Sequence, residues 1–212
     1  MPAASLLLNH LDILTQLDRS LPVLDLACGT GRNGLLLAEQ GVPVVFSDKS
    51  ATALKVVEQR LAEGDLPGRI WRVDLEQPGV NPLSNNCFNA VIGFRYLHRP
   101  LFPALRNAIK PGGLVIYETF TIGNRKFGRP VNPDFLLRPG ELKTMFQDWE
   151  IIDQFEGSLK NPDRAVAQIV ARKPVRKVGP SLKALTNKQT SIGQRLTQNT
   201  RNSRAKTEPF NS

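Results

Sequence analysis

The first third of the chain combines three closely spaced glycines with three acidic residues that follow or interrupt apolar runs. The stretch VLDLACGTGRNG leads from an apolar run into a loop that contains Gly29, Gly31 and Gly34. The acids lie in or at the ends of the runs VLDL, FSD and VDL and are Asp25, Asp48 and Asp74. Glycine accepts positive φ angles and lets a ligand come close to the backbone. This pattern predicts a loop that holds a polar ligand beside negative charge.

The glycine spacing fits two classes of cofactor. G-x-G-x-x-G is typical of loops that bind nicotinamide dinucleotides, but S-adenosylmethionine needs the same backbone freedom. Asp48 lies 19 residues after Gly29 and could accept hydrogen bonds from ribose hydroxyls, which both cofactors contain. Asp25 favours S-adenosylmethionine over a nicotinamide dinucleotide. An acid beside the loop opposes the pyrophosphate of the dinucleotide and favours the ammonium and sulfonium groups of S-adenosylmethionine. No Lys-Ser or Lys-Thr follows the glycines, which excludes a phosphate-binding P-loop.

Apolar runs alternate with segments of helical periodicity as far as residue 120. Strands are expected at 21–26, 42–48, 69–75, 87–94 and 112–120, and two further strands at 149–157 and 164–173. Helices are expected at 5–17, after the glycines, from Ser50 (a good N-cap), over 101–109 and from Pro139 to Phe146. This alternation predicts an α/β, three-layer Rossmann-like sandwich with an antiparallel addition at one edge. The glycine loop then lies at the carboxyl ends of the strands, where such sheets bind ligands.

Taken together, the motifs resemble those of the class I S-adenosylmethionine-dependent methyltransferases. The motifs that carry the resemblance lie within residues 20–172 and are VLDLACGTG, FSD, VDL, FNAVIGFRYLHR and IKPGGLVIYETF. The resemblance implies a mostly parallel seven-stranded sheet with an antiparallel last strand, and S-adenosylmethionine as the cofactor. Asp48 would hold the ribose, and Asp74 with Leu75 would frame the adenine. The other implied cofactor-binding residues are Asp25, Ala27, Cys28, Gly29, Gly31, Phe94 and Arg95.

Residues after the fourth and fifth strands are candidates for contact with the methyl acceptor. His98, Tyr96 and Glu118 are the catalytic candidates; His98 could instead orient the next helix, and Tyr96 could simply pack. The candidate substrate-binding residues are Arg95, Tyr117, Arg125 and Arg129. Residues 119–142 form a long segment that could close over the cofactor as a lid or pack as a surface loop. From Asn132 onward the chain looks like the tellurite-resistance methyltransferase family, which implies a small, anionic or chalcogen-type acceptor.

The positive charge of the chain is concentrated at its end. The tail, 173–212, holds nine basic residues and one acid, so it carries +8 of the net charge of +9, and its polar composition predicts disorder. We therefore expect a methyltransferase domain at 1–172 and a basic tail that could hold nucleic acid or anionic lipid. The alternatives are an RNA or protein methyltransferase that uses the tail, a nicotinamide-dependent oxidoreductase, and a binding module without catalysis.

Cysteine usage and hydropathy bear on the compartment and on metals. Cys28 and Cys87 lack metal-ligand spacing, so no metal is expected, and two unpaired cysteines fit a reducing cytoplasm. Cys28 is interpreted as a small buried residue of the loop, not as a nucleophile. No apolar run reaches the roughly 18 to 20 residues that a membrane span requires.

Overall fold

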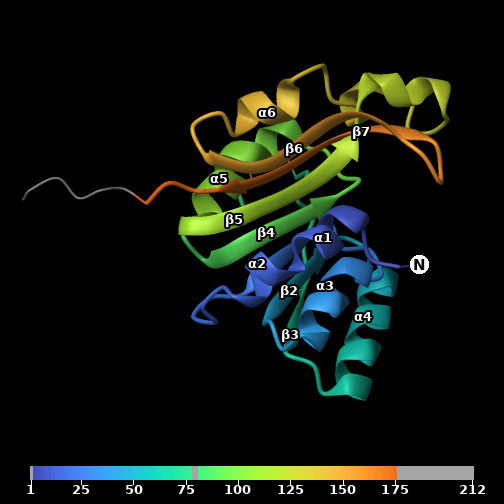
Figure 1. The fold of residues 1–212 in the computed structure, drawn as a ribbon. Helices are drawn as coiled ribbons and strands as arrows, with labels where there is room; N and C mark the ends of the chain where they lie inside the picture. Colours follow the sequence, from blue (N-terminus) through green and yellow to red (C-terminus); the bar gives the residue numbers. More distant parts are fainter. Residues whose placement is uncertain (1, 78–80, 176–212) are drawn as a thin grey trace, which may run out of the picture. The chain divides into compact units, whose positions relative to one another are not determined.

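The computed structural model describes residues 2–77 and 81–175, and it confirms the predicted α/β sandwich (Figure 1). Seven strands form one sheet in the order β3-β2-β1-β4-β5-β7-β6. The strands are β1 (Val23–Leu26), β2 (Val44–Asp48), β3 (Gly68–Arg72), β4 (Phe88–Phe94), β5 (Ile109–Phe120), β6 (Glu150–Leu159) and β7 (Arg164–Arg172). The α-helices are α1 (Ser5–Asn9), α2 (Leu11–Thr15), α3 (Arg32–Glu39), α4 (Ala51–Gly64), α5 (Phe102–Ala108) and α6 (Glu141–Met145). Three short 3-10 helices are η1 (Arg99–Leu101), η2 (Ile122–Lys126) and η3 (Pro133–Phe135).

The direction of the strands matches the expected sheet. Strands β1 to β5 pair in parallel, whereas β7 pairs antiparallel with both β5 and β6. The predicted antiparallel last strand is therefore confirmed, and it lies between β5 and β6. The strand order reverses between β1 and β4, and ligands of open α/β sheets bind outside the carboxyl ends of the strands at such a point.

Both faces of the sheet are covered, because successive side chains of a strand point to opposite sides. One face, with Leu24, Val91 and Val115, packs against α5 and α6. The other face, with Phe46 and Ile92, packs against α1 to α4. Burial on both faces explains why every residue of β1 and β4 is buried and why these strands read as continuous apolar runs.

Two expected helices differ from the observed ones. The expected helix 5–17 is divided into α1 and α2 at His10, whose φ of −123° lies outside the helical range, although Leu7 and Leu14 are fully buried as expected. The helix expected over 101–109 ends at Ala108, and Ile109 begins β5. The prediction for Ser50 is confirmed, since its side chain caps α4 by accepting a hydrogen bond from the Ala53 N–H at 3.2 Å.

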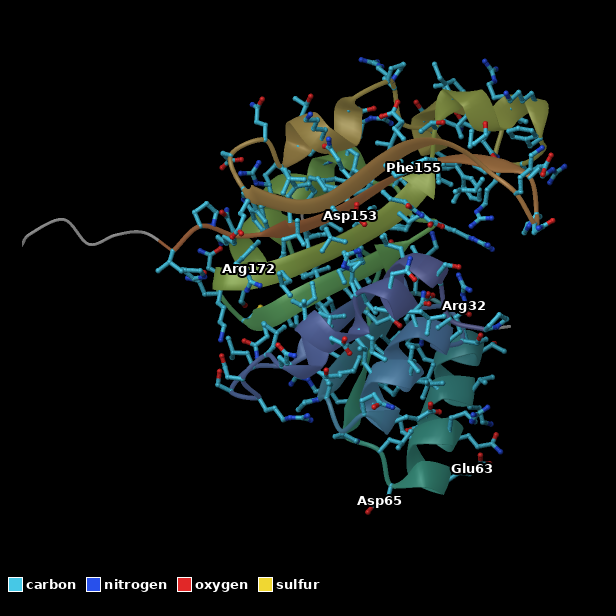
Figure 2. The ribbon with its side chains drawn as sticks, viewed as in Figure 1. Arg32, Glu63, Asp65, Asp153, Phe155 and Arg172 are labelled. Atoms are coloured by element: carbon cyan, nitrogen blue, oxygen red, sulfur yellow. The ribbon has the colours of Figure 1, made fainter. Side chains whose placement is uncertain are left out.

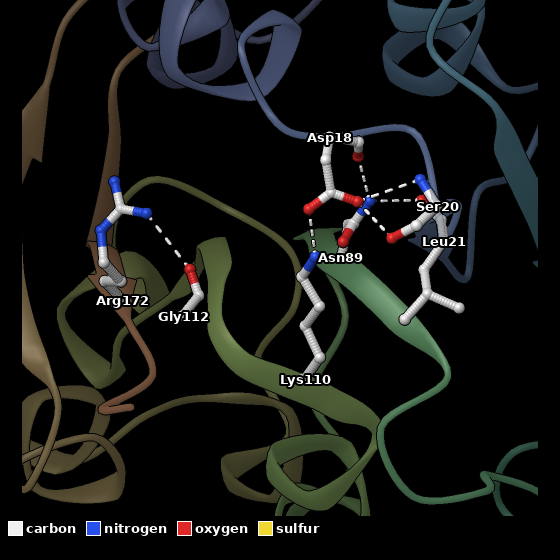
Figure 3. Close-up of polar contacts among 7 residues, drawn as sticks. All are labelled: Asp18, Ser20, Leu21, Asn89, Lys110, Gly112 and Arg172. Carbon is white, nitrogen blue, oxygen red and sulfur yellow. Dashed lines mark hydrogen bonds and ion pairs between the residues drawn. The ribbon is translucent and has the colours of Figure 1, made fainter. Parts of the chain in front are cut away.

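A polar network fixes the end of the sheet opposite the glycine loop (Figure 3). The Asn89 amide donates to the backbone oxygens of Leu21, at 2.6 Å, and of Asp18, which joins the start of β4 to the segment leading into β1. Asp18 in turn forms an ion pair with Lys110 of β5. This end of the sheet is therefore closed by structural contacts, and the open ends of the strands lie at the other edge.

The compact unit extends slightly beyond the expected domain boundary. Lys173 was the first residue of the expected tail, but its N–H donates to the Gly113 oxygen at 2.8 Å, and its ammonium group donates to Arg106 O at 2.7 Å. The rest of the tail, from Arg176 onward, lies outside the described residues. Among the described helices, none has the length and apolarity needed to cross a lipid bilayer.

Candidate functional site

The loop after β1 has an unusual backbone that brings several groups to the carboxyl edge of the sheet. Ala27, Gly29 and Gly31 all have positive φ, of 50°, 56° and 76°. The Cys28 N–H donates to the Ser47 oxygen at 2.9 Å, which fixes the loop to β2. A Cβ atom on Gly31 would lie 2.8 Å from Val57 Cγ2, so α4 packs directly against the loop. A Cβ atom on Gly29 would meet nothing within 4 Å, which leaves that side of the backbone open to a ligand.

Asp25 braces this loop from inside the sheet. Its side chain is 2% exposed, and its Oδ2 accepts a hydrogen bond at 2.9 Å from the N–H of Gly34 in the first turn of α3. Burial raises the pKa of the Asp25 carboxyl to about 7, although the Gly34 hydrogen bond and the nearby Arg32 act in the opposite direction. A cation bound beside the loop would therefore favour the ionised form of Asp25.

Asp48 joins two segments of the site. Its Oδ2 accepts from the Gly29 N–H at 2.8 Å, and its Oδ1 accepts from the Ser50 N–H at 2.8 Å. The first bond orders the glycine loop, and the second fixes the start of α4. Asp74 follows β3, and its Oδ1 accepts from the Glu76 N–H at 3.0 Å. The carboxylates at the ends of β2 and β3 therefore face one region, as the sequence predicts.

A small pocket of about 40 Å³, open to solvent, lies between these strand ends. Its lining comes from the residues after β1, β2, β3 and β4: Ala27, Asp48, Lys49, Val73, Asp74, Leu75, Glu76 and Tyr96. Lys49 and Glu76 form an ion pair of 3.3 Å that joins the ends of β2 and β3. The Tyr96 hydroxyl is buried, and it has no hydrogen-bond partner among the described residues.

The residues around this pocket fit S-adenosylmethionine. The carboxylates of Asp48 and Asp74 suit hydroxyl and amino donors, which S-adenosylmethionine carries on its ribose and adenine. Leu75 and Val73 provide apolar surface, and the unpaired Tyr96 hydroxyl offers a further polar contact. The open face of Gly29 allows a ligand to reach the loop backbone. The half-buried Cys28 thiol has a pKa raised well above its usual value by burial and by the charge of Asp25.

The end of β4 presents three sequence candidates. Phe94 is 9% exposed, and Arg95 is exposed with a φ of 60°. The Arg95 N–H donates to the Glu118 backbone oxygen at 2.8 Å, which keeps β4 and β5 paired at this edge. His98 precedes η1, but its side chain forms no capping hydrogen bond there.

Arg32 lies within electrostatic range of two further arginines, Arg95 and Arg164, and of Glu118. Burial lowers the pKa of Arg32, and the positive charges of Arg95 and Arg164 lower it further, whereas Glu118 and Asp25 raise it. Arg32 lies at the start of α3 (Figure 2) and donates to the Pro2 oxygen at 2.6 Å. Arg164 begins β7, and its buried Nε has no hydrogen-bond partner in the described part of the chain. We call Arg32, Arg95 and Arg164 the arginine cluster.

The structure corrects the expectations for β5. Tyr117 is fully buried in the apolar layer under α5, and its hydroxyl donates to the Tyr96 backbone oxygen at 2.8 Å, so it packs and does not meet a substrate. Glu118 is 4% exposed and accepts a hydrogen bond from the Gln168 side chain, not from the side chain of Arg95. Tyr96 contributes to the pocket described above instead of facing the arginine cluster.

The long segment after β5 is anchored at its base. Leu137 exchanges backbone hydrogen bonds of 2.9 Å with Phe120 and Ile122. Arg99 holds the far end through a bidentate ion pair with Glu141, at 2.6 and 2.9 Å, and through donation to the Leu136 oxygen at 2.8 Å. Arg125 and Arg129 are exposed. The structure therefore keeps these two arginines as solvent-exposed cations and does not bring them into the arginine cluster.

Sequence reasoning missed Arg32, Arg164 and Gln168. Arg32 lies between the second and third glycines of the motif, so its place in the sequence could have indicated that it belongs to the site. Arg164 and Gln168 lie on a closing strand, and the antiparallel pairing of β7 with β5 brings Gln168 opposite Glu118.

Comparison with known proteins finds similarity to methyltransferases over part of the chain. Residues 23–113 match the model of a methyltransferase domain. A demethylmenaquinone methyltransferase from Clavibacter sepedonicus is 34% identical over 104 residues, which cover 47% of this chain and 41% of that protein. The chain thus spans about two fifths of the length of that relative.

Solved structures show the same fold. TehB from Haemophilus influenzae superposes with a TM-score of 0.63 at 21% identity, over 79% of this chain and 61% of TehB. Geranyl diphosphate C-methyltransferase from Streptomyces coelicolor, a structure that contains S-adenosylhomocysteine, gives 0.58 at 16% identity, over 77% of this chain and 74% of that chain. The class I methyltransferase fold is confirmed, and the matches support S-adenosylmethionine as the cofactor.

Proposed function

We propose that this protein is an S-adenosylmethionine-dependent methyltransferase that acts on a small anionic acceptor. The observation that carries the proposal is the carboxylate-lined pocket at the ends of β1, β2 and β3, beside the open face of Gly29. When bound, S-adenosylmethionine supplies a methyl group attached to a positively charged sulfur. The protein has to bind it, align the acceptor and exclude water.

The cofactor-binding roles follow from where the residues lie. The backbone of the loop from Ala27 to Gly31 would hold the amino-acid end, with the Asp25 charge beneath it. Asp48 would accept from the ribose, and Asp74 with Leu75 would frame the adenine. Phe94 and Arg95 end β4 and would border the reacting group.

The arginine cluster supports an anionic acceptor. Burial lowers the pKa of Arg32, and the positive charge of Arg95 lowers it further, whereas Glu118 acts in the opposite direction. The unpaired Nε of Arg164 provides a buried donor. A small oxyanion or carboxylate would relieve the repulsion and satisfy this donor, since guanidinium groups bind such anions through paired hydrogen bonds.

The N-terminal segment favours a small acceptor over a macromolecule. The Ala4 N–H donates to the buried Asn33 side chain at 2.9 Å, and Pro2 accepts from Arg32. Residues 2–4 therefore lie along the start of α3, next to the arginine cluster, and reduce access from that side. His98 remains the candidate that would take a proton from an acceptor that carries one.

An RNA or protein acceptor held by the tail is the second candidate, and the +8 charge of residues 173–212 favours it. This candidate predicts binding that weakens steeply with salt and is lost when residues 176–212 are removed. Unchanged activity after this truncation would contradict it.

Methyl transfer from methyl-labelled S-adenosylmethionine tests the acceptor class. The panel should contain carboxylates, chalcogen oxyanions such as tellurite, neutral analogues and RNA. We expect transfer to a small anion, with KM raised at least about tenfold in Arg164→Gln. Arg172→Gln is the matched control, because Arg172 lies on the same strand and donates to Gly112 at the opposite edge of the sheet (Figure 3). Transfer only to neutral molecules or to RNA would contradict the anionic acceptor.

A further inference from the structure

The chain contains two tyrosines, and their hydroxyl groups differ in hydrogen bonding. The Tyr117 hydroxyl is buried and donates to the Tyr96 backbone oxygen at 2.8 Å. The Tyr96 hydroxyl is also buried, yet it has no partner among the described residues. Buried polar groups are nearly always hydrogen-bonded, because an unpaired one costs free energy. An unpaired hydroxyl on a residue that lines a pocket therefore suggests a ligand atom as its missing partner.

The pocket that Tyr96 lines is the one between the ends of β1, β2 and β3. Tyr96 forms its β4 side, opposite Asp74, Leu75 and Glu76. Each oxygen of Asp48 accepts one hydrogen bond, from Gly29 or from Ser50, and neither oxygen is a partner of the Tyr96 hydroxyl. Tyr96 therefore belongs to the cofactor side of the site, away from the arginine cluster.

The electrostatic surroundings disfavour the acid–base role that the sequence suggested for Tyr96. Burial, followed by the negative charges of Glu76, Asp74 and Asp48, raises the pKa of Tyr96 well above its usual value. The hydroxyl thus stays protonated at neutral pH. A general base needs a pKa near the working pH, whereas a protonated hydroxyl among carboxylates is a permanent donor.

We infer that Tyr96 binds the adenosine half of the cofactor through its hydroxyl group and does not take part in proton transfer. This inference rests on the proposed function, and it adds a cofactor-specificity residue to the site. The hydroxyl would donate to an acceptor atom of the ribose or the adenine while the ring closes the pocket from the β4 side. Binding then satisfies a donor that is unpaired in the ligand-free protein.

Two tyrosine-to-phenylalanine variants of the full chain test this inference. Thermal unfolding without ligand gives their stability, and calorimetry gives the Kd for S-adenosylhomocysteine and for methylthioadenosine, which lacks the amino-acid half. Tyr96→Phe should keep or raise Tm, since it removes an unpaired hydroxyl, and should raise both Kd values about five- to tenfold. Tyr117→Phe should lower Tm, since it breaks a satisfied bond, and should change Kd less than about twofold.

The outcomes distinguish a failure of this inference from a failure of the proposed function. If the wild-type chain does not bind S-adenosylhomocysteine, the proposed function and this inference are both wrong. If the wild type binds and Tyr96→Phe binds equally well, the inference alone is wrong. If Tyr96→Phe binds S-adenosylhomocysteine more weakly but methylthioadenosine equally well, the hydroxyl contacts the amino-acid half of the cofactor, and the inference is wrong. A fall in Tm as large as that of Tyr117→Phe would show that the hydroxyl is already paired, with the same consequence.

Discussion

Replacing Asp25 by asparagine is expected to remove a pH dependence of stability and to weaken cofactor binding. The Asp25 carboxyl is 2% exposed, and burial raises its pKa from 3.8 to about 7. The folded protein therefore keeps this proton at pH values where the unfolded chain has lost it. The Asp25 contribution to stability is then present below about pH 4 and is lost as pH rises towards 7. The two pKa values correspond to about 4 kcal/mol between the plateaus.

The Asp25→Asn substitution removes the carboxylate charge and changes the shape of the side chain very little. The asparagine side-chain oxygen can still accept from the Gly34 N–H, which donates to Asp25 at 2.9 Å. Its amide group would lack a partner, at a cost of about 1–3 kcal/mol, so the slope with pH is more informative than the absolute stability. Asp18, Glu141 and Asp148 have lowered pKa values, so their stabilising contributions are lost only below about pH 4.

Urea unfolding of both proteins at pH 5, 6, 7 and 8 is the assay. Wild-type stability should fall relative to the variant by about 2 to 3 kcal/mol over this range. S-adenosylmethionine should bind wild type more tightly as pH rises through 7, because its cationic groups favour the ionised Asp25. The variant should bind at least about tenfold more weakly at pH 8. Parallel stability curves, or equal affinity, would refute the role assigned to the Asp25 charge.

The remaining predictions concern the loop, a helix cap and the segment anchor. Gly34→Ala should destabilise the fold by more than about 2 kcal/mol in urea unfolding, since its Cβ would lie 2.5 Å from a ring carbon in β2. Gly29→Ala should cost only about 1–2 kcal/mol, for the φ of 56°, yet weaken S-adenosylhomocysteine binding strongly, and equal affinity would contradict the open face. Ser50→Ala should lower stability by about 1 kcal/mol through loss of the α4 cap, read as a fall in Tm. Glu141→Gln should weaken the Arg99 anchor and speed proteolysis within residues 121–141, with unchanged cleavage counting against the anchor.

Local signals were sufficient to predict the cofactor side of the site. The glycine loop, the acids that end successive strands and the Ser50 cap depend on neighbours in sequence, and parallel strands bring their carboxyl ends to one edge. The structure accordingly places Asp25, Asp48 and Asp74 as the pattern predicts. The specific contacts that these residues make with a cofactor stay predictions.

The acceptor side could not be predicted in the same way, because it depends on which face each side chain takes. Tyr117 and Glu118 are adjacent in β5, so they point to opposite faces, and only one could meet an acceptor. Tyr117 enters the layer under α5, whereas Glu118 meets Gln168 of β7. Arg164 reaches Arg32 only through the antiparallel insertion of β7 between β5 and β6. No local pattern near Arg164 indicates that pairing.

Calorimetric titration of the full chain with S-adenosylmethionine, S-adenosylhomocysteine and NADH tests the central claim most directly. Asp25, beneath the glycine loop, should favour the ammonium group that the first two ligands share and oppose the pyrophosphate of the third. We expect saturable binding of S-adenosylmethionine and S-adenosylhomocysteine, with no heat from NADH. Binding of NADH alone would contradict the methyltransferase assignment at its first step.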